Sequence, residues 1–413
     1  MLGHLFDSLL KKGTLTAILP GGRRVCYGRG EPRVTIRLHD SRAVLALVMN
    51  PDLKLGELYM DGRLTVEEGG DVSHLLALLM HNLSLSQPTG WHRLTRIFRN
   101  TTRLFAQFNP AVRAKRNVAH HYDLSGELYA RFLDRDRQYS CAYFQTGDET
   151  IDEAQIAKKR HIAAKLLLNK PGLRVLDIGC GWGGLALDIA RDANATVLGI
   201  TLSEEQIAVA RERSEKAHLS ECCRFELADY RTLRGSYDRI VSVGMFEHVG
   251  VPHYAAFFSK VRQLLADDGV MLLHTIGRLD GPGSTNPWVA KYIFPGGYVP
   301  SLSELTAAVE KNGLLITDIE VLRLHYAKTL AEWRRRFDGQ RAEIAKLYDE
   351  RFCRMWEFYL AGAEMAFRYD NEAVFQVQIV KHQEALPLTR DYMFEGERSR
   401  NFTGAGARPV RAA

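Results

Sequence analysis

Between residues 118 and 385, short apolar runs alternate with segments of helical periodicity, and this pattern constrains the fold more than any other. The runs have the length of strands and are rich in Val, Ile and Leu. They are LRVLDIG, ATVLGIT, CRFELAD, YDRIVSVG and GVMLLHTIG. Helical segments such as EEQIAVARERSEKA and YAAFFSKVRQLLADD lie between them. Alternation of this kind is typical of an α/β fold with an open, mostly parallel, doubly wound sheet.

The first 108 residues follow a different pattern. Short β-like runs broken by glycines come first (TLTAILPGG, RRVCYG and RVTIRLHD), and helical segments follow. The chain has 413 residues, which is enough for two domains of ordinary size. We therefore expect a smaller N-terminal α+β domain over 1–108, a linker over 109–117, the α/β domain over 118–385 and a C-terminal tail over 386–413.

Positive charge is concentrated in the N-terminal part. Residues 1–116 contain 17 Lys and Arg against 9 Asp and Glu. The stretch 91–116 has seven basic residues and no acidic one, and its apolar residues recur on a separate helical face. Two interpretations stay open: a basic amphipathic helix of a membrane-docking domain, or a packing helix with a solvated basic face. The arginines at helical spacing are Arg93, Arg96, Arg99 and Arg103.

Other features exclude several classes of protein. No apolar run is long enough to cross a membrane, and MLGHLFDSLLKKG lacks the order and the cleavage site of a signal peptide. The six cysteines are scattered, and no Cys/His cluster suggests a metal site. No nucleic-acid-binding module accompanies the basic charge. We therefore expect a reduced, cytoplasmic protein without disulfides, metal or nucleic acid.

The stretch LDIGCGWGGLALDIA follows a predicted strand and opens a predicted helix. Gly179, Gly181 and Gly183 allow a tight turn whose backbone N–H groups can face a ligand. The spacing also fits a dinucleotide site, but such a site needs a carboxylate about 20 residues later, at the end of the next strand. Here that strand ends in GITLS, without a carboxylate. Asp177, directly before the loop, suits a cationic ligand better than a pyrophosphate.

S-adenosylmethionine (SAM) is a ligand of this kind, because it carries an ammonium and a sulfonium. The pattern D-x-G-x-G-x-G resembles the SAM-binding loop of Rossmann-like methyltransferases. In that superfamily a second carboxylate at a strand end contacts the adenine, and Asp229 of LADY has this position. A helix cap or a turn residue is an equally good interpretation of Asp229 taken alone.

Three polar residues follow strand-like runs in the second half of the chain: Glu247, His274 and Tyr326. His274 ends the apolar run of LLHTIG, where a hydrogen-bonded core histidine is the simplest interpretation. Sites in doubly wound sheets form at the carboxyl ends of strands, however. The three side chains are therefore expected to converge beside the SAM methyl group.

Four stretches in a fixed order carry a closer resemblance: YSCAYF (139–144), DIGCGWGG, MFEHVG (245–250) and LLHTIG (272–277). With HYDLSGELYARFLD and FPGGYVPSLSE, they closely resemble the cyclopropane-fatty-acyl-phospholipid synthases and mycolic acid cyclopropane synthases. The resemblance covers residues 115–380 strongly. The first 110 residues are similar to the N-terminal domain of the longer bacterial members that act on phospholipids. The resemblance implies a Rossmann-like SAM-methyltransferase fold.

The resemblance also assigns residues to two ligands. Those for SAM are Tyr139, Ser140, Asp177, Gly179, Gly181, Gly183, Thr201, Leu202, Ser203, Gln206, Asp229 and Tyr230. Family members hold a bicarbonate ion beside the methyl group, and the matching residues are Cys141, Glu247, His274, the backbone of Ile276, and Tyr326. One departure is Ala363, which aligns with a cysteine of some family members.

The reaction implied by the resemblance adds a methylene group across a cis double bond of a phospholipid acyl chain. Methyl transfer to the alkene leaves a carbocation, and loss of a proton from the new methyl group closes the ring. Bicarbonate would be the base, and Glu247 must then accept a hydrogen bond from it or be protonated, since two bare anions repel. Expected partners are unsaturated phospholipids at the inner face of an anionic membrane and a second copy of the chain.

Three other functions remain open from the sequence. One is an alkene methyltransferase that leaves a methyl-branched chain. Another is a small-amine methyltransferase, which would need neither bicarbonate nor a membrane-facing helix. The third, from a different class, is a lipid-binding or SAM-binding protein without turnover.

Overall fold

The computed structural model describes residues 2–85 and 125–399, which fall into two compact units. One unit combines residues 2–85 with Ser284–Pro295 and Ala327–Glu372; we call it the N-terminal unit. The other described residues form the sheet unit. The expected domain over 118–385 is therefore interrupted by two segments that belong to the N-terminal unit. The predicted basic helix (91–116) and linker (109–117) lie outside the described residues.

The N-terminal unit has the predicted α+β character. Its sheet has the order β2-β1-β3-β4, with β1 parallel to β3 and the other pairs antiparallel. The strands are β1 (Gly13–Ile18), β2 (Arg24–Arg29), β3 (Arg33–Leu38) and β4 (Leu64–Glu68). The first helices are α1 (Leu2–Leu9), α2 (Ser41–Met49), α3 (Pro51–Met60) and α4 (Val72–Leu85). Apolar side chains that alternate along the strands, such as Leu15 and Ala17, form the core with these helices.

Three later helices complete this unit. They are α12 (Pro287–Tyr292), most of α14 (His325–Leu347), and α15 (Glu350–Tyr369). Helix α15 packs against α3 and α4. Trp288 is buried against Phe358, with ring centroids 4.7 Å apart, and it lies over Gly56 of α3. A β-carbon at Gly56 would stand 2.4 Å from the indole nitrogen, so the close approach requires glycine.

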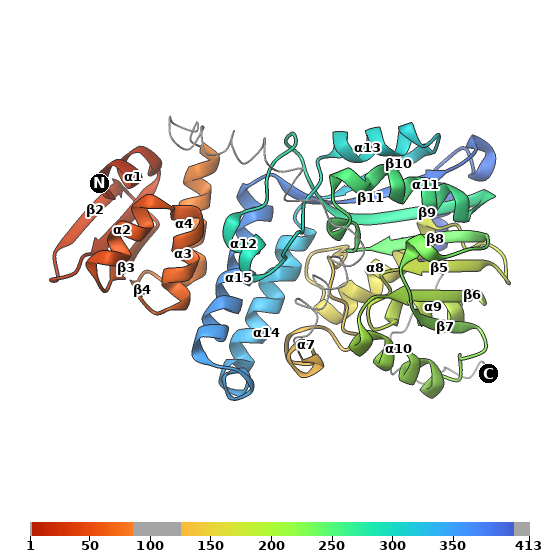
Figure 1. The fold of residues 1–413 in the computed structure, drawn as a ribbon, viewed down its shortest axis with the longest axis horizontal. Helices are drawn as coiled ribbons and strands as arrows, with labels where there is room; N and C mark the ends of the chain where they lie inside the picture. Colours follow the sequence, from red (N-terminus) through yellow and green to blue (C-terminus); the bar gives the residue numbers. More distant parts are fainter. Residues whose placement is uncertain (1, 86–124, 400–413) are drawn as a thin grey trace. The chain divides into compact units, whose positions relative to one another are not determined.

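The sheet unit contains seven strands in the order β10-β11-β9-β8-β5-β6-β7 (Figure 1). Five of them pair in parallel, as predicted, and β10 and β11 pair antiparallel. The parallel strands are β5 (Arg174–Ile178), β6 (Thr196–Thr201), β7 (Cys223–Leu227), β8 (Tyr237–Val243) and β9 (Leu265–Arg278). The other two are β10 (Leu315–Leu322) and β11 (Glu372–Val380). Strand β11, buried along nearly its whole length, was not identified from the sequence.

Helices cover both faces of this sheet. Consecutive strand residues belong to different cores: Leu176 packs in the core that includes α11 and α13, and Val175 in the core of α8, α9 and α10. The helices are α7 (Gly126–Phe132), α8 (Ile151–Lys165), α9 (Gly184–Asp192), α10 (Glu204–Lys216), α11 (Tyr254–Leu264), α13 (Leu302–Lys311) and α16 (Asp391–Ser399). This two-sided burial explains why the strands are continuous apolar runs.

The C-terminal segment is more ordered than predicted. Residues 391–399 form α16, which packs against α8, although a tail was expected from residue 386. Gln378 of β11 donates a hydrogen bond to the Tyr392 hydroxyl at 2.7 Å. The sequence did not predict this order, because a short amphipathic pattern does not reveal that α16 packs against α8.

In residues 2–85 and 125–399, no helix is long and apolar enough to cross a membrane. All six cysteines are free.

Candidate active site

The glycine loop connects β5 to α9 and shapes one wall of a pocket in the sheet unit. Gly179, Gly181 and Gly183 all have positive φ, at 87°, 54° and 83°. A β-carbon at Gly183 would lie 2.7 Å from the Phe225 ring, and one at Gly179 would lie 2.8 Å from Met245 Cβ. Backbone conformation and packing therefore both require glycine, as the pattern predicted.

Asp177 lies at the end of β5, beneath this loop, and is 2% exposed. Burial raises its pKa to about 7, although the positive charge of Lys158 opposes the shift. Within the described part of the chain, Asp177 forms no ion pair. A desolvated carboxylate without a counterion favours a cationic ligand, because such a ligand restores the lost electrostatic stabilisation.

The first turn of α10, which follows β6, presents the Gln206 amide to the pocket. Thr201 Oγ1 donates a hydrogen bond to Gln206 Oε1 at 2.9 Å, which orients the amide group. Ser203 caps α10 by accepting from the Gln206 backbone N–H at 3.2 Å. Gln206 and Leu202 line the pocket, whereas Ser203 supports the turn and does not line it.

Asp229 fits both interpretations given above. Its side chain caps the short 3₁₀ helix Tyr230–Thr232 and pairs with Arg231, with 2.9 Å between Asp229 Oδ1 and Arg231 Nε. It also lines the pocket beside Tyr230. The hydrogen bonds from Arg231 lower the pKa of Asp229 in spite of its burial, so this acceptor is ionised.

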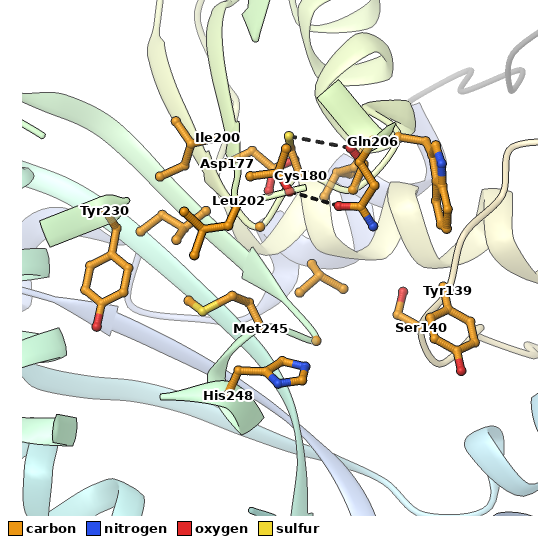
Figure 2. A pocket seen from close by; sticks show the side chains of 18 of the residues that line it. Tyr139, Ser140, Asp177, Cys180, Ile200, Leu202, Gln206, Tyr230, Met245 and His248 are labelled. Atoms are coloured by element: carbon orange, nitrogen blue, oxygen red, sulfur yellow. Dashed lines mark hydrogen bonds between the residues drawn. The ribbon is translucent and has the colours of Figure 1, made fainter. Parts of the chain in front are cut away.

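Tyr139 and Ser140 approach the pocket from the opposite side to Tyr230 (Figure 2). Ser140 is held by Lys158 of α8, whose fully buried Nζ donates to Ser140 Oγ at 2.8 Å and to Gln138 Oε1 at 2.7 Å. Burial lowers the pKa of Lys158 to about 8. The sequence analysis missed Lys158, because a lysine in the pattern IAKKRHIAAK looks like a solvated helix residue.

The pocket brings together ten of the twelve predicted SAM residues. They are Tyr139, Ser140, Asp177, Gly179, Gly181, Thr201, Leu202, Gln206, Asp229 and Tyr230. The other two, Gly183 and Ser203, are the N-cap residues of α9 and α10 and do not line the pocket. The pocket has further lining residues that the sequence did not predict, among them Trp182, Met245, His248 and His253.

Glu247 lies in a 3₁₀ turn (Phe246–His248) after β8 and is buried. Its Oε1 accepts a hydrogen bond from the backbone N–H of Ile276 at 2.6 Å. Its Oε2 is buried and has no hydrogen-bond partner within residues 2–85 and 125–399. Burial raises the pKa of Glu247, which favours the protonated acid, a group that can donate as well as accept.

His274 lies inside β9 and not at its end, because β9 continues to Arg278. It is the last residue of β9 that pairs with β8, opposite Val243, so it still lies at the carboxyl end of β8. His274 and Ile276 are two residues apart on one strand, so their side chains share a face. His274 is buried, and Gln376 Nε2 of β11 lies 3.2 Å from its Nδ1. The burial lowers its pKa, which makes the ring neutral.

Cys141 and Tyr326 belong to segments that meet in the structure. The Phe144 backbone N–H donates to His325 Nδ1 at 3.0 Å, and the His325 ring stacks on Tyr143. Cys141 is buried, with Sγ 3.3 Å from the Ala142 carbonyl oxygen. Tyr326 follows β10 as expected and is buried. That Cys141, Glu247, His274 and Tyr326 contact one ligand stays a prediction.

Comparison with known proteins shows which family this chain resembles. A family model described as mycolic acid cyclopropane synthetase matches residues 110–377, and one described as a domain of unknown function matches 5–86. A probable fatty acid methyltransferase of Pseudomonas putida is 41% identical over 67% of this chain and 73% of its own length. The cyclopropane-fatty-acyl-phospholipid synthase of Escherichia coli K12 is 38% identical over 84% of this chain and 90% of its own length.

Solved structures agree with these matches. The cyclopropane synthase MmaA2 of Mycobacterium tuberculosis aligns with a TM-score of 0.62 and 34% identity, covering 66% of this chain and 99% of its own. The mycolic acid cyclopropane synthase CmaA1, complexed with SAH and CTAB, aligns with a TM-score of 0.60 and 36% identity, with the same coverage. The chain belongs to the mycolic acid cyclopropane synthetase family and is a SAM-dependent methyltransferase.

Proposed function

We propose that this enzyme is a cyclopropane-fatty-acyl-phospholipid synthase that adds a methylene group across a cis double bond of a phospholipid acyl chain. The observation that carries the proposal is the buried Glu247 carboxyl group. The Ile276 N–H anchors one of its oxygens, and the other has no hydrogen-bond partner in the described part of the chain. His274, whose ring is neutral, lies two residues before Ile276 on β9. The family and the similarity to the Escherichia coli enzyme support the same function.

The pocket fits SAM at several points. The unpaired carboxylate of Asp177 would hold the cationic methionine part, and the glycine loop would offer its backbone N–H groups. The oriented Gln206 amide would bind the ribose side, and Asp229 and Tyr230 would border the adenine. When bound, SAM supplies an electrophilic methyl group.

Glu247 and His274 fit a small oxyanion. A protonated Glu247 and a neutral imidazole can each donate one hydrogen bond, and neither carries a negative charge that would repel an anion. The orphaned Oε2 of Glu247 is the kind of buried polar atom that a bound ligand satisfies. Bicarbonate, when bound there, would supply the base for ring closure. Cys141 and Tyr326 complete the proposed set.

These residues have distinct tasks in the reaction. Alkenes are weak nucleophiles, so the pocket must act chiefly by alignment, which supplies effective molarities of about 10⁵ to 10⁸ M in well-oriented systems. After methyl transfer, the new methyl group must lose a proton, and a positioned base contributes about 10² to 10⁴-fold. Glu247 and His274 hold that base in place through hydrogen bonds and remain unalkylated themselves.

The test uses the purified full chain, labelled SAM and vesicles of a cis-monounsaturated phospholipid. Acyl chains are analysed by mass spectrometry and proton NMR, in buffer depleted of bicarbonate and after its restoration. Ring closure predicts a mass gain of one CH₂ unit, loss of alkene protons, high-field ring protons and a rate that rises with bicarbonate. The absence of ring protons from a methylated product would refute the proposed function.

A second candidate is an alkene methyltransferase that leaves a methyl-branched chain. The similarity to the probable fatty acid methyltransferase of Pseudomonas putida favours it. This activity shares the SAM pocket and the first methyl transfer, and it differs in where the carbocation loses its proton. The same product analysis separates the two, because a methyl branch has no ring protons.

The location of the enzyme follows from its proposed substrate. We infer that the chain acts as a peripheral protein at the inner face of an anionic membrane, in the cytoplasm, and as a homodimer. The excess of basic residues in 1–116 supports membrane attraction. Sedimentation of the chain with and without anionic vesicles tests both the membrane binding and the dimer.

A further inference from the structure

Gln376 is a buried polar residue that the proposed mechanism has not yet used. It lies in the middle of β11 and is 1% exposed. Its amide has two partners: Lys165 Nζ of α8 donates to Oε1 at 2.8 Å, and Nε2 lies 3.2 Å from His274 Nδ1. The amide group therefore joins a lysine to the histidine of the proposed anion site.

The chemistry of Lys165 decides how this amide is oriented. An ammonium group has only hydrogen-bond donors, so it must face the oxygen of Gln376. The NH₂ group of Gln376 then faces His274 and must donate to it. A donor on that side requires His274 Nδ1 to be the acceptor. The single ring proton of the neutral imidazole must therefore be on Nε2, on the opposite edge of the ring.

Further ionic contacts fix the position of Lys165. Its Nζ also pairs with Glu320, which accepts from His161 Nε2 at 2.6 Å. His161 Nδ1 lies 3.1 Å from Glu397 of α16. Lys165 is thus attached to a network of side chains from α8, β10 and α16, all of them within the sheet unit.

The charges around His274 favour the neutral imidazole, as the hydrogen bonds do. Its burial lowers its pKa most strongly, and the cations Lys158, Lys165 and His161 lower it further. The negative charge of Glu320 opposes them. Protonation of Nδ1 would also place an N–H against the NH₂ group of Gln376. Both effects exclude the imidazolium form at neutral pH.

We propose that Lys165 and Gln376 are a positioning pair that fixes His274 as the neutral Nε2–H tautomer, so that Nε2 can donate to the anion. The pair touches neither SAM nor the anion, and it acts only through His274. The role of Nε2 as an anion donor rests on the proposed function. The tautomer itself follows from the contacts alone, so it can be tested without turnover.

Gln376→Glu is the most informative variant, because it changes the direction of one hydrogen bond with little change in shape. A carboxylate paired with Lys165 can only accept from His274. Nδ1 would then have to carry a proton, which gives the Nδ1–H tautomer or the imidazolium. In Lys165→Met, the amide loses the group that orients it, so the two tautomers of His274 are expected to coexist.

Gln378→Glu is the matched control. Gln378 lies two residues along β11, so it shares the face of Gln376, and it is equally buried. Its amide donates to the Lys165 carbonyl oxygen and to the Tyr392 hydroxyl and has no contact with His274. This variant introduces the same charge into the same strand but should leave the His274 tautomer unchanged. Thermal unfolding of all variants separates loss of stability from loss of positioning.

The experiment uses the full chain labelled with ¹⁵N-histidine and long-range ¹H–¹⁵N NMR, in which each tautomer has its own pattern of ring-nitrogen shifts. The His274 signal is identified as the one missing from His274→Gln. We expect Nε2–H in the wild type and in Gln378→Glu, and Nδ1–H or imidazolium in Gln376→Glu. An Nδ1–H signal in the wild type, or no change in both Gln376→Glu and Lys165→Met, would overturn the proposal.

Kinetics on unsaturated phospholipid vesicles then test the role of the pair. We expect kcat of Gln376→Glu to fall by about 10- to 100-fold, as is typical when a partner that orients a functional histidine is lost. The Kd for SAM should not change. Unchanged kcat despite a switched tautomer would overturn the positioning role. If the wild type shows the expected tautomer but makes no methylated lipid, the proposed function fails and the tautomer lock stands.

Discussion

Glu247 accepts a hydrogen bond from the Ile276 backbone N–H at 2.6 Å, and this contact joins the turn after β8 to the strand that carries His274. The bond satisfies one carboxyl oxygen, and the other is buried without a hydrogen-bond partner among the residues that the structure describes. A carboxyl group in this environment is neutral more readily than one in water, because burial raises its pKa. Two residues that are far apart in the sequence thus form one proposed anion site.

The first prediction distinguishes two roles for Glu247: holding the bicarbonate base by a hydrogen bond, or accepting the proton itself. Glu247→Gln keeps a neutral group that accepts from Ile276 and donates through its NH₂, so it should retain most turnover and its response to bicarbonate. Glu247→Ala and His274→Ala should each lose about 10² to 10⁴-fold in kcat, the contribution of a positioned base. SAM affinity, measured by calorimetry, should change little in all three. Loss of activity in Glu247→Gln equal to that in Glu247→Ala would show that Glu247 itself takes the proton.

SAM binding should depend on pH through Asp177. Its pKa is about 7 because the carboxyl group is buried, so below pH 7 a cationic ligand must displace a proton. We expect the Kd for SAM to rise as the pH falls from 8 to 6, with proton release measurable by calorimetry in buffers of different ionisation enthalpy. Asp177→Asn should bind SAM about 10- to 150-fold more weakly, as expected for a lost charged hydrogen-bond partner, and should show no such pH dependence. An unchanged pH dependence in Asp177→Asn would assign the proton to another group.

The contact of His161 with α16 should stabilise the fold in a pH-dependent manner. Burial lowers the pKa of His161, but its hydrogen bonds with Glu320 and Glu397 outweigh this and raise it. The stabilisation is therefore complete below the unfolded pKa of about 6.5 and is lost as the pH rises through the higher folded value. Glu397→Gln should reduce the free energy of unfolding by about 1 to 3 kcal/mol at pH 6 and by less at pH 9. Urea unfolding at both pH values measures this, and an equal loss at both would contradict it.

Gly56 should be intolerant of alanine despite its helical position. Gly→Ala inside a helix usually stabilises by about 1 kcal/mol. At Gly56 the new β-carbon would stand 2.4 Å from the buried Trp288 indole, and overpacking of this kind costs about 1 to 3 kcal/mol. We expect a net destabilisation in urea unfolding. The control is Gly339→Ala in α14, where nothing lies within 4 Å of the new carbon and a small gain is expected. Equal gains in both variants would show that the Trp288 contact is not a constraint.

The basic stretch at 91–116 gives a prediction from the sequence alone, since it lies outside the described residues. Neutralising its helically spaced arginines should weaken binding to anionic vesicles most at low salt, because screening removes the attraction at high salt. The four are Arg93, Arg96, Arg99 and Arg103. A control variant removes the same charge from four exposed residues, Lys11, Lys12, Arg23 and Arg29. Equal binding by the two variants in vesicle sedimentation would favour the packing interpretation.

The elements that could be predicted are those with a local signature. Strands β5 to β9 are recognisable as strand-like runs in the sequence. The loop needs positive φ at Gly179, Gly181 and Gly183, and the glycine pattern indicates this. The place of Asp177 in the pocket was predictable for the same reason, since it directly precedes the glycine loop that forms the pocket wall. Such signals lie within a few neighbouring residues of one another.

The residues that were missed depend on partners far along the chain. Lys158 and Gln376 are polar residues in segments that give no sign of burial, and each acquires its role from contacts with other elements, Lys158 with Ser140 and Gln376 with His274. The division into units was missed for a related reason. In the sequence, segments 284–295 and 327–372 lie between parts of the sheet unit, but in the structure they belong to the N-terminal unit. No local periodicity encodes such long-range pairing.

The most direct test of the central claim counts the deuterium atoms that reach the lipid from methyl-deuterated SAM. Ring closure removes one of the three deuterium atoms from the transferred methyl group, so the acyl chain should gain a CD₂ unit and lose its alkene protons. Retention of all three in a CD₃ branch would contradict a cyclopropane synthase and identify an alkene methyltransferase. Glu247→Ala, which should reduce label transfer by about 10² to 10⁴-fold, is the control that shows whether the label was transferred at this site.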